Sequence, residues 1–297
     1  LSGLQLVLTG AAALVAIKAA AGEGFGAGLD RPLQRWDGNS AFARMFDGIW
    51  IALAAAFLLL PLTAIMLAGL PGLAALPISV WWAAMNSVLV AALSTVLLLL
   101  LAVPMATAVA LGRSGAIEVA GILGLAASPL VIGTGLFIVI YPIADPFALA
   151  LPVTALVNAV MALPFALRIL VPRARAVVGR YGQLAVSLDM GGWPFVWRVL
   201  LPRMRAQIGF AGGLAAALSM GDLGVIALFA DPEFATLPLQ IYRLMRAYRM
   251  GGAAGAALVL QSLSMAGVWV LGRGGRRPAE GAEMLGRGRG AVAEGGG

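Results

Sequence analysis

The stretch WWAAMNSVLVAALSTVLLLLLAVPMATAVALG, residues 81–112, decides the fold class of this chain. It ends a longer segment, 48–112, that contains no charged side chain. A helix needs about 20 consecutive apolar residues to cross a bilayer. The segment is long enough for two such helices, and Pro71-Gly72 and Pro77 mark the point where a turn between them is favoured.

The remainder of the chain repeats this character. Segments 119–144, 146–167 and 250–272 also lack charged residues, and charged residues make up only 11% of the 297. A soluble domain has about a quarter of its residues charged. Spans must be helical because lipid cannot satisfy exposed backbone groups. We therefore predict an all-α polytopic transmembrane bundle with about seven spans, near 3–20, 48–70, 78–111, 118–141, 148–171, 206–229 and 251–272.

Two missing residue types limit the chemistry. The chain has no Cys and no His, so it lacks thiolate nucleophiles, the usual general base and the commonest metal ligand. Its one lysine, Lys18, does not belong to a phosphate-binding Gly-Lys-Ser/Thr loop. An intramembrane aspartyl protease would need G-x-G-D, but Ser219 occupies the first glycine position before Asp222. We predict no catalytic residue and no metal site, and a membrane-embedded enzyme or a structural scaffold remains the alternative class.

The basic residues predict the orientation. The net charge of +7 is spread between the spans, which favours positive flanks over nucleic-acid binding. If the linker 21–47, segment 112–117, loop 172–205 and tail 273–297 face the cytoplasm, only Arg243, Arg246 and Arg249 lie outside. The tail is rich in glycine and charged residues, has too few large apolar residues to bury, and is expected to be disordered. An outside start, with Leu1 and no visible signal, suggests a piece of a longer chain.

One polar, aromatic segment, SLDMGGWPFVWRVLLPRMR (187–205), interrupts the apolar pattern. Residues 181–190 can form a short helix that Gly191-Gly192 ends, and Pro194 can begin a second. The second helix is expected to end at Leu201-Pro202, because proline disfavours helix in the residue before it. A helix–turn–helix on the membrane surface would offer an apolar ridge to a soluble partner.

This segment resembles the cytoplasmic signature of permease subunits from binding-protein-dependent ABC importers of the type I class. That signature reads E-A-A-x-x-x-G and, about nine residues later, an apolar residue followed by x-L-P. Residues 183–189 read QLAVSLD, with Gln183 in place of Glu and Asp189 in place of Gly, and WPFVWRVLLP follows. The resemblance implies that the loop docks into a separate ATPase. The residues expected to couple are Gln183, Leu184, Ala185, Ser187, Leu188, Asp189, Gly191 and Pro202.

The next stretch, ALSMGDLGVIALFADPEFATLPLQIYRLMRAYR (217–249), is similar to permeases for thiamine or thiamine pyrophosphate, which fuse two six-helix halves. The resemblance implies that 1–20 ends the first half and that 48–272 is the second. Ferric-iron permeases share G-[DE]-[LF]-G and are the alternative. The implied partners are an ATPase dimer, which alone uses ATP, a periplasmic binding protein, and a preceding half or second copy in a bacterial inner membrane. No cofactor is expected in this chain.

Asp222 is the one acidic residue predicted inside the sixth span. A carboxylate at membrane depth usually faces a wet pathway or a paired cation. We therefore assign Met220, Gly221, Asp222 and Phe229 to a substrate pathway, which the thiazolium cation of thiamine would suit. The alternative is structural, with Asp222 capping a helix break or pairing with Arg243.

Three arginines recur every third residue in the predicted outer loop 230–250: Arg243, Arg246 and Arg249. On a short helix they would lie on one side and could dock an acidic face of a binding protein. The alternative is an amphipathic surface helix with snorkelling arginines.

Overall fold

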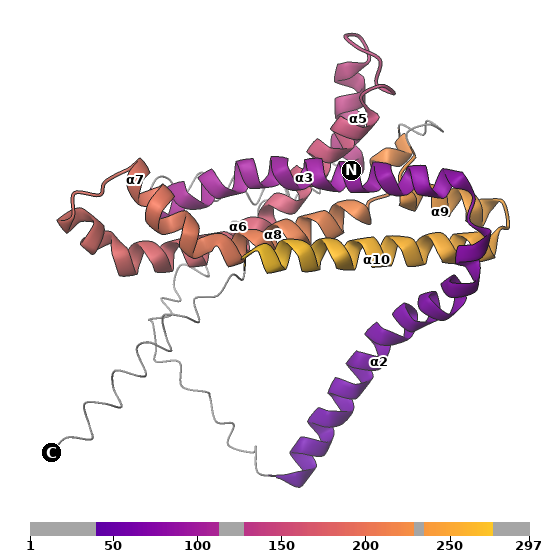
Figure 1. Cartoon of the computed structure of the whole chain (residues 1–297), viewed down its shortest axis with the longest axis horizontal. Coiled ribbons are helices and arrows are strands. Elements are labelled where there is room, and N and C mark those ends of the chain that lie inside the picture. Colours follow the sequence, from indigo (N-terminus) through magenta and orange to yellow (C-terminus); the bar gives the residue numbers. More distant parts are fainter. Residues whose placement is uncertain (1–39, 113–127, 229–234, 276–297) are drawn as a thin grey trace.

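The computed structural model describes residues 40–112, 128–228 and 235–275, and within these ranges the chain forms helices and turns without strands (Figure 1). This confirms the all-α fold class. The helices are α2 (Ala41–Gly72), α3 (Ile78–Ala110), α5 (Pro129–Ile140), α6 (Ala150–Ser187), α7 (Trp193–Phe195), α8 (Leu201–Met220), α9 (Leu237–Arg246) and α10 (Met250–Gly275). The predicted span 3–20, the linker to residue 39, and the tail from 276 lie outside the described residues.

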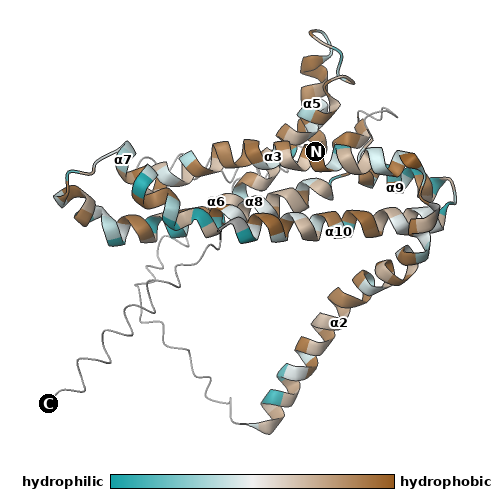
Figure 2. Ribbon diagram, viewed as in Figure 1, coloured by the Kyte–Doolittle hydropathy of each residue, from teal (hydrophilic) through white to brown (hydrophobic). Residues whose placement is uncertain are grey.

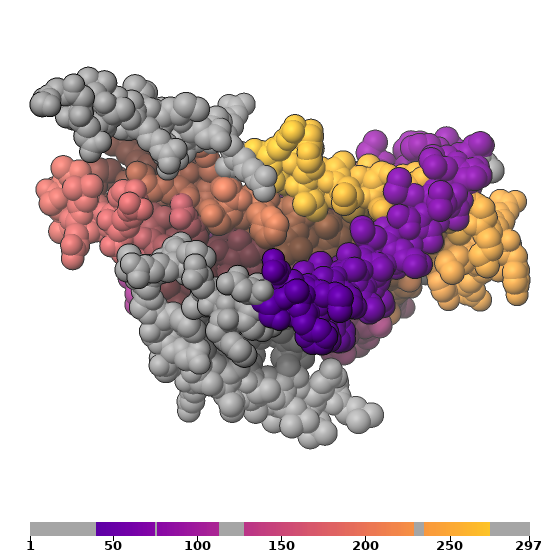
Figure 3. All heavy atoms as spheres, turned by 90° about the horizontal axis from the view of Figure 1, so that it is seen from below, coloured from indigo at the N-terminus to yellow at the C-terminus, as the bar shows by residue number. Residues whose placement is uncertain are grey.

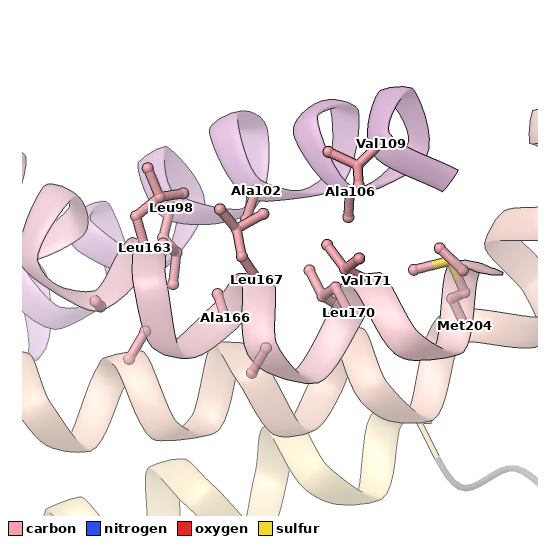
Figure 4. Close-up of a cluster of buried hydrophobic side chains, with 14 of the residues drawn as sticks. Leu98, Ala102, Ala106, Val109, Leu163, Ala166, Leu167, Leu170, Val171 and Met204 are labelled. Carbon is pink, nitrogen blue, oxygen red and sulfur yellow. The ribbon is translucent and has the colours of Figure 1, made fainter. Parts of the chain in front are cut away.

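Helices α3, α6, α8 and α10 lie side by side and form an elongated bundle (Figure 1). Its largest core lies between α3, α6 and α8, where Leu98, Leu170 and Met204 are fully buried (Figure 4). Many of the other core residues are alanines. Small side chains allow transmembrane helices to approach closely, so alanine sets the tight spacing of this bundle.

The helices of the bundle consist mostly of apolar residues (Figure 2), and many of their large apolar side chains are exposed. Four described helices, α2, α3, α6 and α10, are long and apolar enough to cross a membrane. Helix α2 is exposed along nearly its whole length, and Phe57 is 78% exposed. Bare apolar surface of this extent is expected of a membrane protein. Helix α5, which falls in the predicted span 118–141, has 12 described residues, and 113–127 lie outside the description.

Helix α2 contacts the bundle at its C-terminal end, and its other end lies away from the bundle (Figure 1). Seen from below, the indigo and purple atoms of α2 lie in front of the bundle (Figure 3). The contact is a crossing of glycines. A Cβ atom built on Gly72 would collide with the carbonyl oxygen of Gly251, and one built on Gly255 would lie 2.8 Å from the Gly72 carbonyl group. The two backbones touch here because neither side carries a side chain.

Helix α2 begins seven residues before the predicted span of 48–70. Ser40 caps it, since its hydroxyl accepts a hydrogen bond from the Ala43 N–H at 3.4 Å. The end of the predicted linker 21–47 is therefore helical. Apolar periodicity could not show this, because Arg44 and Asp47 lie in the first two turns.

Helix α6 corrects the prediction that 172–205 is a loop. It continues through Pro172 to Ser187 and has 38 residues, or ~57 Å at the usual rise per residue. That length exceeds the ~30 Å thickness of the hydrocarbon core. The helix is therefore longer than one bilayer crossing requires, and the first predicted surface helix (181–190) is its continuation.

The entry to α8 corrects a second prediction. The helix that begins at Trp193 does not end at Leu201-Pro202, as the sequence predicted. Residues Val196–Leu200 form a π-helical turn that leads into α8, and the Leu201 N–H bonds to the Val196 carbonyl, five residues back. Proline has no N–H, and its ring would clash with the carbonyl four residues earlier. The wider turn places Pro202 in the first turn of α8, where proline is tolerated.

Helix α8 also ends earlier than the predicted span 206–229. It stops at Met220, so Asp222 follows the helix rather than lying inside it. A short 3-10 turn, Ile226–Leu228, comes next. The glycines that flank Asp222 weaken the helix at this point.

Candidate functional site

The turn after α6 is closed by backbone hydrogen bonds of the Schellman type. The Met190 N–H bonds to the Ala185 carbonyl at 2.8 Å, and the Asp189 N–H bonds to the Val186 carbonyl at 3.1 Å. Asp189 has a φ of 52°, the left-handed conformation that this motif usually gives to glycine. The glycine of the signature that the segment resembles falls at this residue, so its physical role is to end α6.

Replacing Asp189 by glycine should therefore stabilise the turn. A non-glycine residue in the left-handed region costs roughly 1 kcal/mol, somewhat less for Asp than for Ala. We expect Asp189→Gly to raise the unfolding temperature of the purified protein slightly and Asp189→Ala to lower it. Differential scanning fluorimetry of the three proteins measures the order, and an alanine variant as stable as the glycine variant would contradict this account.

The tip, defined as residues 183–198, lies at one end of the bundle (Figure 1) and exposes several apolar side chains. Leu184 and Leu188 lie one helical turn apart and are 56% and 61% exposed. Trp193 and Trp197 are also exposed and stack on each other, with ring centroids 5.9 Å apart. Exposed apolar patches beyond the membrane-spanning part are typical of protein contacts.

Ala185 does not belong to this exposed surface. It is buried within the chain, although we expected it to form the contact ridge. The reason is the continuation of α6, which turns position 185 inward while positions 184 and 188 face outward. Of the other residues predicted to couple, Gln183, Ser187, Asp189 and Gly191 are exposed at the tip, and Pro202 is exposed in the first turn of α8.

Arginines fix the base of the tip to the bundle. The Arg203 guanidinium lies 4.1 Å from the centre of the Tyr181 ring. Arg173 donates from Nε to the Arg203 carbonyl at 3.4 Å. These contacts join α6 to the first turn of α8.

A cavity of about 370 Å³ lies where α5, α6 and the end of α8 meet. Its described lining residues are Pro129, Asn158, Met161, Ala162, Phe165, Ala217, Leu218, Ser219, Gly221 and Asp222. Phe165 and Leu218 are partly exposed, so the cavity opens to the outside of the bundle. Ser219 lies 16 residues along α8 from Arg203, or ~24 Å, which places the cavity toward the end of the bundle opposite the tip.

A directional chain of hydrogen bonds supports one wall of this cavity. Ser94 donates to the Ala155 carbonyl at 2.9 Å, so it must accept from Ser219, whose oxygen lies 3.0 Å away. Each hydroxyl has a single proton. Ser219 therefore accepts from Nδ2 of Asn158, also at 3.0 Å, and the Asn158 amide is fixed in orientation.

The two carboxylate oxygens of Asp222 lie in different surroundings. Oδ1 accepts the Gly224 N–H at 3.0 Å, which closes the turn after α8. Oδ2 is buried and has no hydrogen-bond partner in the described part of the chain. A buried carboxylate oxygen without a partner is costly. The capping role in the structural alternative therefore accounts for Oδ1.

Of the other residues assigned to the substrate pathway, only some line the cavity. Gly221 lines the cavity, whereas Met220 does not and is buried against Ala91 and Ala216. Phe229 lies outside the described residues. Sequence reasoning did not assign Asn158, Ser219 or Ser94 to the substrate pathway. Asn158 could have been found, because it is the only amide or acid between residues 146 and 167.

Helix α9 closes the end of the bundle opposite the tip (Figure 1). Its apolar face, with Leu237 and Leu244, packs against α3 and α10. Ser87 of α3 accepts the Leu237 N–H at 2.8 Å. The expectation that three arginines share one helix is wrong for Arg249. The helix ends at Arg246, and Tyr248 adopts a φ of 56° before Arg249.

Known proteins resemble this chain along most of its length. The thiamine transport system permease protein ThiP of Brucella abortus (strain 2308) is 33% identical over 230 residues, which are 75% of this chain and 42% of that protein. The ThiP proteins of Salmonella typhimurium (33% over 229 residues; 73% and 42%) and Escherichia coli K12 (32% over 241 residues; 77% and 45%) are similar. No family model matches the chain.

The fold defines the class first: the chain is a polytopic α-helical membrane protein. The similarities confirm the resemblance to permeases of ABC importers and identify the chain as a homologue of thiamine transport permeases. The chain spans less than half the length of these relatives.

Proposed function

We propose that this chain forms half of the transmembrane permease of an ABC importer that carries thiamine, or its pyrophosphate, across a bacterial inner membrane. A periplasmic binding protein would deliver the substrate, and a separate ATPase dimer would bind the tip. A preceding permease half, or a second copy, would complete the pathway. The chain itself would hydrolyse nothing. The similarity to permeases named for thiamine transport is the observation that carries this proposal.

The arrangement of the surfaces supports it. The apolar tip and α9 lie at opposite ends of a bundle long enough to cross a membrane (Figure 1). The cavity lies beside the last residues of α8, away from the tip. Closure of an ATPase around the tip would push on α6 and α8 directly, because the tip joins these two helices. Both helices also line the cavity, so a movement at one end would reach it.

Uptake in the host tests this proposal. Deleting the chain should abolish energy-dependent uptake of radiolabelled thiamine at low external concentration, and a plasmid copy should restore it. Ferric-iron uptake, measured in the same cells, should be unchanged. Normal thiamine uptake combined with lost iron uptake would replace the thiamine assignment with the ferric-iron alternative.

A docking experiment tests the role of α9. Arg246 is exposed beside Tyr242 at the outer end of the bundle in this proposal. We expect Arg246→Glu to weaken binding of the periplasmic protein several-fold at low salt and less at high salt, because salt screens exposed charge pairs. Arg273→Glu is the matched control, since Arg273 also stacks on an aromatic ring, that of Trp269 on α10. A loss independent of salt would favour a surface helix with no docking role.

A further inference from the structure

A second pocket, of about 220 Å³, lies between α8 and α10 and shares no described lining residue with the cavity beside Asp222. The two helices run in opposite directions: Ser264 donates to the Met220 sulfur at 3.6 Å, and Gly213 packs against Val268 further along. The pocket therefore lies where α8 begins and α10 ends, at the tip end of the bundle (Figure 1). Its described lining residues are Ala206, Gln207, Phe210 and Gly272.

Gly272 keeps this α8–α10 pocket open. A Cβ atom built on Gly272 would meet nothing within 4 Å, so free space lies in front of the α10 backbone. On the α8 side, Oε1 of Gln207 is buried and has no hydrogen-bond partner in the described residues. A ligand that donates a hydrogen bond would supply one. Such placed polar groups orient ligands in mostly apolar sites.

The surface around the pocket changes from apolar to cationic within a short distance. Trp269 and Arg273 lie one turn apart on α10, and the Arg273 guanidinium lies 3.8 Å from the centre of the Trp269 ring. Trp269 and Phe210 are both more than half exposed. The apolar part of α10 that is able to cross a membrane ends at Arg273. The pocket therefore lies at the expected boundary between hydrocarbon and water.

A second arginine lies on the α8 side. Arg203 precedes Gln207 by four residues, so both lie on one face of α8. Arg203 is exposed, and its guanidinium is held over the Tyr181 ring at 4.1 Å. A guanidinium that stacks on a ring keeps its N–H groups at the edge free to bind an anion. Two fixed cations thus flank the pocket.

An anionic phospholipid matches this combination of groups. Tryptophan is enriched at the membrane–water interface, and arginines at the ends of spans attract anionic headgroups. Guanidinium and phosphate form short, paired hydrogen bonds. Exposed aromatic rings next to the cations suit acyl chains, whereas a soluble anion would gain nothing from them.

We propose that the α8–α10 pocket binds the headgroup of an anionic phospholipid that carries headgroup hydroxyls, as phosphatidylglycerol does. The phosphate would contact Arg273, a hydroxyl would donate to Oε1 of Gln207, and the acyl chains would lie along Trp269 and Phe210. The inference is independent of the proposed transport function, because it requires only that the chain lies in a membrane. The bound lipid would join α8 to α10 beside the tip.

Native mass spectrometry of the purified full chain tests this proposal, with phosphatidylglycerol and phosphatidylcholine supplied in equal amounts. We expect phosphatidylglycerol to be retained roughly tenfold more strongly, from the two arginines. Arg273→Gln should weaken its retention about fivefold, because one arginine near an anionic headgroup contributes about that factor. Retention of phosphatidylcholine should change little.

A second variant tests the pocket itself. Gly272→Leu should fill the space and reduce retention of phosphatidylglycerol at least as much as Arg273→Gln does. The fold should survive, because a Cβ atom there meets nothing within 4 Å and leucine favours a helix over glycine.

Arg246→Gln provides the matched control. Arg246 is exposed and also lies beside an aromatic ring, that of Tyr242 at 5.8 Å, but it belongs to α9 at the other end of the bundle. Its variant loses the same charge and should retain phosphatidylglycerol as the wild type does.

Three results would overturn the proposal. The first is equal retention of the two lipids, or normal retention of phosphatidylglycerol by Gly272→Leu. The second is displacement of the lipid by a large excess of inorganic phosphate at constant ionic strength, which would make the pocket a site for free phosphate. The third is an Arg273→Gln protein that retains phosphatidylglycerol normally but binds a soluble ATPase less well, which would assign Arg273 to a protein contact.

Discussion

Replacing Leu188 by Asp should uncouple transport from ATP hydrolysis. In the proposed complex Leu188, 61% exposed at the tip, enters a cleft of the ATPase. An aspartate would then be buried there without a partner, at a cost of roughly 3–5 kcal/mol. Each ~1.4 kcal/mol is a tenfold change in affinity. We therefore expect thiamine uptake to fall by on the order of a hundredfold, and the ATPase to lose its stimulation by loaded binding protein.

The fold of the permease should survive this change, because the Leu188 side chain faces outward. The control is Ala176→Asp, which places the same charge on an exposed position of α6, 12 residues or ~18 Å before Leu188. It should leave uptake and ATPase stimulation near wild type. Full coupling in a well-folded Leu188→Asp protein would remove the tip from the ATPase interface.

Hydrophobic patterning predicted the fold class and the approximate positions of the long helices that the structure describes. It could not predict the helix ends, because these depend on local hydrogen bonds. The hydrogen bond that Ser40 accepts lets α2 begin before the predicted span. A π-helical turn, Val196–Leu200, precedes α8 and accommodates Pro202 in the first turn of that helix. Proline predicted a stop there because sequence rules assume an α-helical turn, whereas a wider turn accommodates the ring.

The candidate site was predictable only in part, for a related reason. Asp222 was noticeable because a carboxylate is rare in an apolar stretch. Ser94 and Ser219 are 125 residues apart, and nothing in the sequence brings them together. Their contact depends on α3 packing beside α8. For Ala185 the matching motif predicted contact with an ATPase, which stays a prediction, but it did not predict that the side chain is buried within the chain.

The glycine crossing between α2 and α10 should be the least tolerant point of the described fold. A Cβ atom on Gly255 would lie 2.8 Å from Gly72 backbone atoms and 3.1 Å from the Leu73 nitrogen. Backbone atoms cannot move aside as a flexible side chain can, so the helices must separate. Overpacking typically costs 1–3 kcal/mol. We expect Gly255→Ala and Gly72→Ala each to cost about 3 kcal/mol and to lower the unfolding temperature in detergent by several degrees.

Gly251→Ala separates this effect from helix propensity. Gly251 lies one turn before Gly255 on the same helix, but a Cβ atom there would meet nothing within 4 Å. Alanine favours a helix over glycine by about 1 kcal/mol, so this variant should be as stable as wild type or more so. Combining Gly72→Ala with Gly255→Ala should cost less than the sum of the two, because the first clash already separates the helices that the second would push apart. Strict additivity would mean that the two glycines do not share one crossing, and α2 would then be held to the bundle by other contacts.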